Sequence, residues 1–181
     1  MSAPEPESDL GARTVFLVGF MGAGKSSVGL ALSRTLGWPF EDLDERIEAR
    51  EHRSIEQIFQ QSGEPAFRRI EHAALRSLIL ELGASPRVVA VGGGVFAQAN
   101  NAALLEKAGF PVVFLDAPVE ELFRRCQEQQ LKRPLRRDLE EFRRLYEARR
   151  PYYLKAAVRI ETGGKDVAKV AAEAIKSLGL R

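Results

Sequence analysis

The segment from Gly19 to Ser26 carries the clearest chemical signal in the chain. Its sequence, GFMGAGKS, fills every fixed position of the phosphate-loop pattern G-x-x-x-x-G-K-[ST]. Glycines let several backbone N–H groups point into one concavity that suits an anion, and a helix expected to start near Lys25 adds the positive end of its dipole. Lys25 can reach the β- and γ-phosphates, and the Ser26 hydroxyl can bind Mg²⁺. The loop therefore predicts binding of a nucleoside triphosphate and leaves the phosphate acceptor open.

Two aspartates, Asp42 and Asp44, end a short strand predicted over 39–44. On an extended strand, residues two apart point to the same face. One carboxylate could hold Mg²⁺ through its water shell, and the other could accept the proton of an attacking hydroxyl. The alternative is that Asp44 only caps the next helix, for which aspartate is a good residue. The spacing alone leaves both interpretations open.

Three consecutive glycines, Gly92 to Gly94, follow a buried strand predicted over 88–91. Glycine is costly in regular structure, so a run of this kind usually has a local reason. These residues allow a ligand to approach the backbone closely and expose N–H groups to it. A plain flexible turn is the alternative interpretation.

Several arginines could bind an anionic substrate or its phosphates. Arg68 and Arg149 lie on predicted helices, and arginine binds a carboxylate through two parallel hydrogen bonds. Taken singly, each is more commonly a solvated surface charge. Arg133, in a basic loop interrupted by Pro134, could close over the phosphates. A nucleic-acid patch over 132–137 is disfavoured because few aromatic residues lie among these charges and the net charge of the chain is only +2.

These residues must be positioned by a pattern of alternating strands and helices. Strands are predicted at 14–18, 39–44, 88–91, 111–115 and 158–161. Helices are predicted from about 25 to Gly37, and at 46–51, 54–61, 65–82, 100–108, 119–128, 138–149 and 167–178. This alternation indicates βαβ units, and hence a parallel sheet with helices on both faces. Ligands of such sheets bind at the carboxyl ends of the strands, where the phosphate loop, the two aspartates and the glycines all lie.

Composition narrows the class of protein further. The 181 residues are 45% apolar, which predicts one globular domain over 13–181. The polar residues 1–12 are expected to be a disordered tail. Cys126 is the only cysteine, which excludes an intramolecular disulfide and fits a reducing cytoplasm. The spacing of His52 and His72 does not favour a metal site, and both are expected at the surface. Neither the charge nor the apolar runs point to a membrane.

Taken together, the motifs resemble the shikimate kinase family, from about Thr14 to the last helix. The matching segments are GFMGAGKSSVG at 19–29, FEDLDERIE at 40–48, SIEQIFQQSGEPAFRRIE at 54–71, GGG at 92–94, RPL at 133–135 and RRPYY at 149–153. A phosphate loop alone is shared by many nucleotide enzymes, whereas these motifs in this order are highly specific. The resemblance implies an α/β P-loop kinase fold with three layers, a five-stranded parallel sheet in the order 2-3-1-4-5, and a lid at about 126–138.

The resemblance also implies an activity and a set of site residues. The family transfers the γ-phosphate of ATP to the 3-hydroxyl of shikimate, in the route to chorismate and aromatic amino acids. The ATP-binding positions that match are Gly22, Ala23, Gly24, Lys25, Ser26, Ser27, Arg125 and Arg133. The shikimate-binding positions that match are Asp44, Arg68, Glu71, Gly92, Gly93, Gly94 and Arg149. Members of the family are commonly monomers, so a cytoplasmic monomer is expected, acting on small molecules and not on nucleic acid or membrane.

The same correspondence assigns a role to individual residues. Asp44 would bind the shikimate hydroxyls and activate the nucleophile, with Lys25 and Arg133 as the other catalytic residues. One Mg²⁺ per subunit would be held by Ser26 and, through water, by Asp42. The matched roles of the remaining side chains are a carboxylate clamp for Arg68 and Arg149, orientation of Arg68 for Glu71, and adenine stacking for Arg125.

The chain departs from the family pattern in places, and other functions compete with this one. Gly163 to Lys165 stand where members often carry an adenine-contacting arginine, and Ser27 stands where threonine is commoner. One competing hypothesis keeps the kinase and changes the acceptor to a nucleoside monophosphate or gluconate. Another is a P-loop regulator that senses ATP without phosphorylating a small molecule. It is disfavoured because a sensor has no need of the aspartates, glycines and arginines together.

Overall fold

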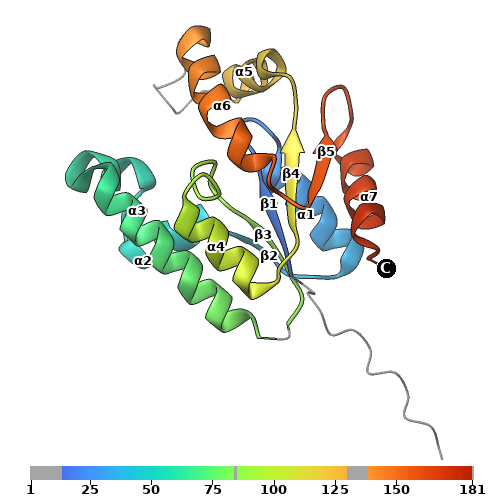
Figure 1. The fold of residues 1–181 in the computed structure, drawn as a ribbon, viewed down its shortest axis with the longest axis horizontal. Helices are drawn as coiled ribbons and strands as arrows, with labels where there is room; N and C mark the ends of the chain where they lie inside the picture. The colour runs from blue at the N-terminus through green and yellow to red at the C-terminus, as the bar shows by residue number, and fades with distance from the viewer. Residues whose placement is uncertain (1–13, 84, 130–137, 181) are drawn as a thin grey trace, which may run out of the picture.

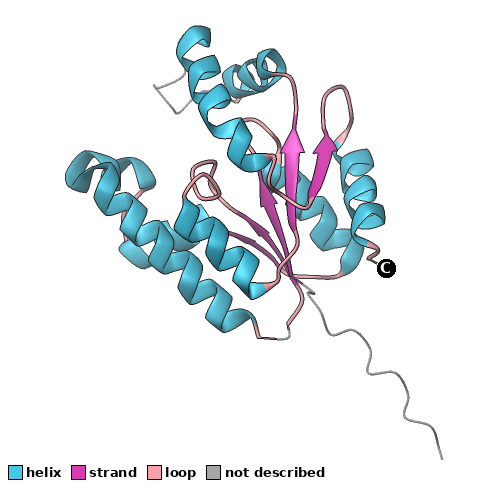
Figure 2. Cartoon of the chain, in the orientation of Figure 1, coloured by secondary structure: helices cyan, strands magenta, loops and turns pink. Residues whose placement is uncertain are grey.

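A five-stranded parallel sheet forms the centre of the protein, in a computed structural model that describes residues 14–83, 85–129 and 138–180. The strand order is β2-β3-β1-β4-β5, which confirms the predicted order. Figure 2 shows that all the arrows run in one direction. The strands are β1 (Thr14–Val18), β2 (Phe40–Asp42), β3 (Arg87–Ala90), β4 (Val112–Asp116) and β5 (Val158–Glu161).

Helices cover both faces of this sheet and give the fold its three layers. The helices are α1 (Lys25–Leu36), α2 (Leu43–Glu51), α3 (Ile55–Leu82), α4 (Ala99–Ala108), α5 (Val119–Glu128), α6 (Leu139–Tyr153) and α7 (Val167–Leu178). Helices α1 and α7 pack together on one side, and α3 and α4 lie on the other (Figure 1). Helices α5 and α6 lie beyond the tip of β4, at the carboxyl end of the sheet (Figure 1). No helix among the described residues is long and apolar enough to cross a membrane.

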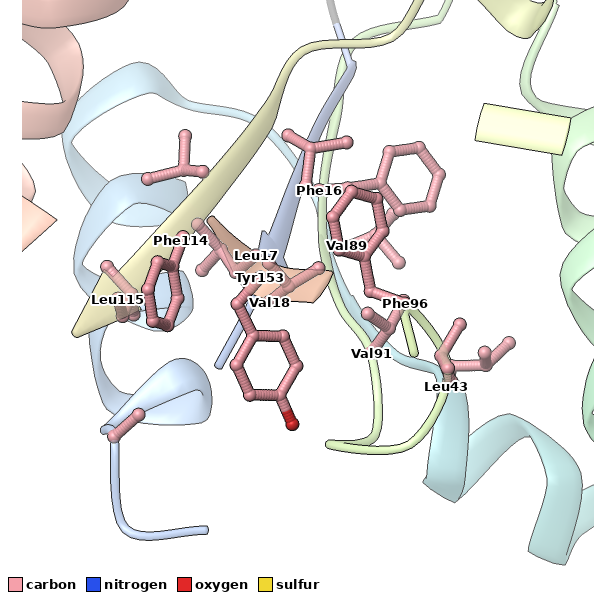
Figure 3. Packing of buried hydrophobic residues seen from close by; sticks show 14 of the residues in the cluster. Phe16, Leu17, Val18, Leu43, Val89, Val91, Phe96, Phe114, Leu115 and Tyr153 are labelled. Atoms are coloured by element: carbon pink, nitrogen blue, oxygen red, sulfur yellow. The ribbon is translucent and has the colours of Figure 1, made fainter. Parts of the chain in front are cut away.

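Strands β1 and β4 form the core because helices cover them on both sides. Every residue of both strands is buried, as expected for a parallel strand that reads as a continuous apolar run. Figure 3 shows the side chains of Phe16, Leu17 and Val18 among those of neighbouring elements. The strand register pairs Val18 with Phe114 and Asp42 with Ala90. The carboxyl ends of these strands therefore meet at one edge, where the loops that follow them must lie.

The structure corrects the predicted bounds of two elements. Strand β2 ends at Asp42, and Asp44 lies in the first turn of α2, so the argument that both carboxylates share one face of a strand was wrong. Helix α6 was expected to end at Arg149 and instead continues through Pro151 to Tyr153. Pro151 has no N–H to donate to the carbonyl four residues earlier, but the turn that follows it is closed by the N–H of Leu154 donating to the Arg150 carbonyl at 3.1 Å.

The predicted break in the third helical region is confirmed. Gly63 has φ 77° and ψ 170°, which is not a helical conformation, and it kinks α3 between its first two turns and the longer part that follows. The expected tail over 1–12 lies outside the described residues. So does most of the lid expected at about 126–138, including Arg133.

Candidate active site

The phosphate loop joins β1 to α1 and rests directly on α5. Helix α1 begins at Lys25, with Gly24 as its N-cap at φ 89°. Gly22 has φ 80°, and a Cβ added to it would lie 2.6 Å from the Leu122 carbonyl oxygen and 2.9 Å from the Cys126 Sγ. Glycine is therefore required at this position both by the backbone conformation and by the space that α5 leaves. The predicted loop and the start of its helix are present as the pattern indicated.

The Lys25 side chain is held by hydrogen bonds to the backbone of the phosphate loop. Its Nζ donates hydrogen bonds to the carbonyl oxygens of Gly19 at 2.9 Å and Phe20 at 3.1 Å. Burial lowers the pKa of Lys25 to about 8, although the negative charges of Asp44 and Asp42 act in the opposite direction. The ammonium thus lies in a desolvated position within electrostatic reach of both aspartates.

Asp42 connects the phosphate loop to α2. The Ser26 hydroxyl donates a hydrogen bond to Asp42 Oδ2 at 3.2 Å, and the backbone N–H of Asp44 donates to Asp42 Oδ1 at 2.9 Å. Asp42 is therefore the N-cap of α2. The sequence left open that Asp44 caps this helix, and the structure gives that role to Asp42. The cap fixes the first turn of α2 and with it the starting direction of the Asp44 side chain.

Each of the three consecutive glycines lies against a different predicted side chain. A Cβ added to Gly92 would lie 3.0 Å from Asp44 Oδ1, and one added to Gly93 would lie 3.4 Å from Arg149 Nη1. A Cβ added to Gly94 would lie 2.8 Å from Arg68 Cζ, so a side chain there would displace the guanidinium. The glycines thus gather three chain segments into one acceptor cluster, which we define as Asp44, Arg68, Arg149 and Gly92–Gly94.

Arg68 is fixed within this cluster by two carboxylates of α3. Its Nη1 donates to Glu71 Oε2 at 2.8 Å, and its Nη2 donates to Glu64 Oε1 at 3.2 Å. Glu71 is buried at 1% exposure and accepts a second hydrogen bond, from Gln98 Nε2 at 2.7 Å. Gln98 is a contact that sequence reasoning missed, because no motif marks a glutamine four residues after the glycine run.

Arg149 belongs to α6 and contributes to the cluster beside Gly93. Its guanidinium lies over the ring of Phe20, 5.9 Å from the ring centroid. The nearby Tyr153 hydroxyl donates a hydrogen bond to the carbonyl of Gly93, and burial raises the pKa of Tyr153 to about 12. In Figure 3, the ring of Tyr153 lies among the apolar side chains and its oxygen points away from them. The matching segment at 149–153 contained Tyr153, but nothing in it indicated this contact.

A separate pocket of about 350 Å³ lies on the other side of the phosphate loop. Arg125 lines it and donates to the carbonyl oxygens of Gly22 at 3.3 Å and Thr162 at 3.1 Å. Lys165 also lines the pocket, and its Nζ pairs with Glu173 at 2.7 Å. The predicted ATP-binding residues Gly22, Ala23, Gly24, Ser27 and Arg125 all line this pocket.

The histidines add nothing to this site. His52 is exposed, as expected, whereas His72 is half-buried because its Nδ1 lies 2.7 Å from Oδ1 of the buried Asn101. Among the described residues, no group of three or more histidine, cysteine, aspartate or glutamate side chains is arranged to hold a metal ion. A divalent cation at this site would therefore need further ligands, such as a hydroxyl, a bound phosphate and water.

The phosphate loop and the acceptor cluster meet at the carbonyl of Gly19. Its oxygen accepts a hydrogen bond from Lys25 at 2.9 Å, and a Cβ added to Gly93 would lie 3.4 Å from the same oxygen. A nucleotide phosphate at Lys25 and an acceptor on the glycines would thus be neighbours. This sheet order, with a phosphate loop after the first strand and an acid-and-arginine cluster beside it, defines a P-loop kinase that acts on a small molecule.

Comparisons with known proteins identify the family. The family model for shikimate kinase matches residues 21–179. A shikimate kinase of Caulobacter vibrioides is 45% identical over 157 residues, which cover 85% of this chain and 76% of the relative. The crystal structure of the Aquifex aeolicus shikimate kinase is 37% identical with a TM-score of 0.80, covering 92% of this chain and 96% of that one. The chain belongs to the shikimate kinase family.

A second solved structure is similar over nearly the whole chain. The shikimate kinase from Acinetobacter baumannii, solved in complex with shikimate, is 31% identical with a TM-score of 0.83. The match covers 95% of this chain and 96% of that one. The similarity therefore includes the elements that form both the phosphate loop and the acceptor cluster.

Proposed function

We propose that this protein transfers the γ-phosphate of ATP to the 3-hydroxyl of shikimate, a step in the biosynthesis of chorismate. The observation that carries the proposal is the contact between the two halves of the site at the Gly19 carbonyl. Phosphoryl transfer depends on positioning and charge neutralisation more than on covalent chemistry, and this arrangement supplies both. Shikimate is an anion with three hydroxyls, which matches a cluster of two arginines, an acid and the backbone of a glycine run.

The acceptor would be held between α3 and α6. In this proposal Arg68 and Arg149 bind its carboxylate from opposite sides, and Glu71 holds Arg68 in place. Asp44 accepts a hydrogen bond from the attacking hydroxyl and takes its proton as the new O–P bond forms and the bond from the γ-phosphorus to the ADP oxygen breaks. In this proposal the backbone of Gly92 and Gly93, both half-buried, binds the other hydroxyls, whereas Gly94 is buried against Arg68.

The phosphates would be held by the loop and its lysine. The backbone of Gly22–Ser27 binds the phosphates, and Lys25 exchanges its hydrogen bonds to the Gly19 and Phe20 carbonyls for phosphate oxygens. Arg125 contacts the adenine side of the pocket. Arg133, outside the described residues, is assigned to the phosphates by its motif alone. We place the enzyme in the cytoplasm as a monomer, on the same ground of family resemblance.

The residues present fit one Mg²⁺. The Ser26 hydroxyl and the Asp42 carboxylate lie 3.2 Å apart at the end of the phosphate loop, and both offer the hard oxygen ligands that Mg²⁺ takes. Ser26 would bind the ion directly and Asp42 through water. The bound ion would neutralise negative charge on the transferring phosphate.

An acceptor panel tests the proposal. ADP release would be followed with shikimate, gluconate and a nucleoside monophosphate, each with and without Mg²⁺. We expect turnover with shikimate only, and only in the presence of the ion. Turnover with gluconate or the monophosphate in place of shikimate would reassign the acceptor. Nucleotide binding without turnover of any acceptor would support the sensor hypothesis instead.

A further inference from the structure

The carboxylate of Asp116 is the buried centre of an ion-pair network that none of the proposed steps uses. It lies at the end of β4 and is 2% exposed. Arg150 Nη2 donates to its Oδ2 at 2.9 Å, and Arg159 Nε donates to the same oxygen at 3.0 Å. The Tyr146 hydroxyl donates to Oδ1 at 3.1 Å, and burial together with the Asp116 charge raises the pKa of Tyr146. One carboxylate thus ties α6 and β5 to the end of β4.

Two of these contacts fix the rotation of α6 about its axis. Tyr146 and Arg150 are four residues apart, so they lie one above the other on one face of the helix. Neighbouring residues of a helix point about 100° apart, so a fixed Arg150 sets the direction in which Arg149 leaves the helix. The aromatic contacts of Phe20 with Phe142 and Tyr146 also hold α6. Those contacts are less directional than charge-assisted hydrogen bonds to a carboxylate.

We propose that Asp116 is a positioning residue for acceptor binding, and that it acts by holding Arg149 over Gly93 through Arg150 and Tyr146. The inference rests on the proposed function, because it takes Arg149 as the ligand of the shikimate carboxylate. A positioning role would explain why the protein buries a charge that the stability of its fold does not require. Buried ion pairs are often no more stabilising than apolar residues of similar size, so this one need not be retained for the fold alone.

Two variants weaken the network in different ways. Asp116→Asn keeps the shape and removes the charge that pairs with Arg150, whereas Arg159 keeps its ion pair with Glu161. Arg150→Gln is the milder change, since Asp116 keeps its pairs with Arg159 and Tyr146. Glu120→Gln is the matched control, because the pair of Arg143 with Glu120 at 2.8 Å also anchors α6 but is solvent-exposed and faces α5. Arg150→Gln still tests the inference if Asp116→Asn does not fold.

The kinetic prediction separates positioning from general damage. In Arg150→Gln, and in Asp116→Asn if it folds, we expect the KM for shikimate to rise on the order of tenfold, the effect of ~1.4 kcal/mol. We expect kcat to stay within about twofold and the Kd for an ATP analogue to be unchanged, because neither Asp116 nor Arg150 lines the pocket beside the phosphate loop. The control should match the wild type. An unchanged KM, or a parallel loss of kcat and nucleotide affinity, would overturn the inference.

A double-mutant cycle shows whether Arg149 carries the effect. If Asp116 acts through Arg149, Arg150→Gln should change the KM for shikimate little further when Arg149 is already alanine. Additive effects would overturn the inference, because a general loss of structure adds to the loss of Arg149. Wild-type turnover of shikimate, measured alongside, keeps the two proposals distinguishable. If the wild type turns over shikimate and the effects are additive, only this inference fails. If the wild type does not turn over shikimate, both proposals fail.

Discussion

The hydroxyl of Tyr153 donates a hydrogen bond to the carbonyl of Gly93, and so joins the last turn of α6 to the glycine run after β3. The two residues are 60 positions apart in the chain. Tyr153 is fully buried, and its ring packs on Phe114 of β4 with centroids 5.2 Å apart. The phenol therefore holds one glycine of the acceptor cluster against the helix that carries Arg149.

Tyr153→Phe should weaken shikimate binding and lower stability. The change leaves the ring in place but removes the donor to the Gly93 carbonyl, which costs about 1 kcal/mol of unfolding free energy and a several-fold rise in the KM for shikimate. Tyr152→Phe is the control, because Tyr152 is 41% exposed. Steady-state kinetics and thermal unfolding measure both effects. Identical behaviour of the two variants would show that the hydrogen bond has no role.

Asp44→Asn should abolish most turnover without affecting nucleotide binding. The amide keeps the size of the carboxylate but cannot take the proton of the attacking hydroxyl, so kcat should fall by roughly 10²–10⁴-fold. The N-cap of α2 belongs to Asp42, so the helix should start as before. Glu45→Gln, one residue further and exposed, is the control. A kcat within a few-fold of the wild type would remove Asp44 from the role of base.

Glu71→Gln should raise the KM for shikimate far more than Glu64→Gln, although both carboxylates pair with Arg68. Glu71 is buried and lies 2.8 Å from Arg68 Nη1, whereas the Glu64 side chain is 65% exposed. Solvent screens the exposed pair, so only the buried one should fix the guanidinium. We expect about a tenfold rise for Glu71→Gln, from the loss of a charge-assisted bond, and less than about twofold for Glu64→Gln. Equal effects would contradict this assignment.

ATP binding should take up a proton at alkaline pH. The pKa of Lys25 is lowered by burial to about 8 from 10.5, and phosphate oxygens favour the ammonium form, so binding raises this pKa again. ATP affinity should therefore fall as pH rises above about 8. In the unfolded chain Lys25 has its ordinary pKa of 10.5 and holds more protons than in the folded protein. Its contribution to stability therefore rises with pH between about 8 and 10.5.

Calorimetry in two buffers of different ionisation enthalpy measures this uptake. At pH 9 the wild type should take up about one proton per ATP bound, because Lys25 is then mostly neutral before binding. Lys25→Arg is the control, since a guanidinium stays charged at this pH and should take up none. The same uptake in both proteins would assign the proton to another group.

The phosphate loop, the sheet and most helix bounds could be predicted because their determinants are local. The loop is eight consecutive residues, and the strands are short apolar runs separated by helical periods. The kink at Gly63 was also readable, since glycine followed two residues later by proline interrupts a helix. The family motifs then indicated which side chains form the acceptor cluster, and the structure places Asp44, Arg68 and Arg149 around one glycine run.

The contacts that hold those side chains could not be predicted in the same way. Gln98 reaches Glu71 from 27 residues away, and Asp116 accepts from Arg150 over 34. No periodicity or spacing reports such pairs, because each depends on how separate elements pack. The error at Asp44 had a different origin. In sequence, an aspartate in the first turn of a helix looks the same as one that ends a strand. The hydrogen bond from the Asp44 N–H to the Asp42 carboxylate shows that Asp44 lies in the helix.

Redesign of this enzyme for another acceptor is constrained by the glycine run. Gly92, Gly93 and Gly94 contribute backbone alone beneath Asp44, Arg149 and Arg68, and an added methyl group on Gly94 would collide with the arginine. Side chains added to these glycines would displace the groups that we propose bind the acceptor. Libraries intended to admit a larger or differently charged alcohol should therefore vary the surrounding helices α3 and α6 and leave these three codons fixed.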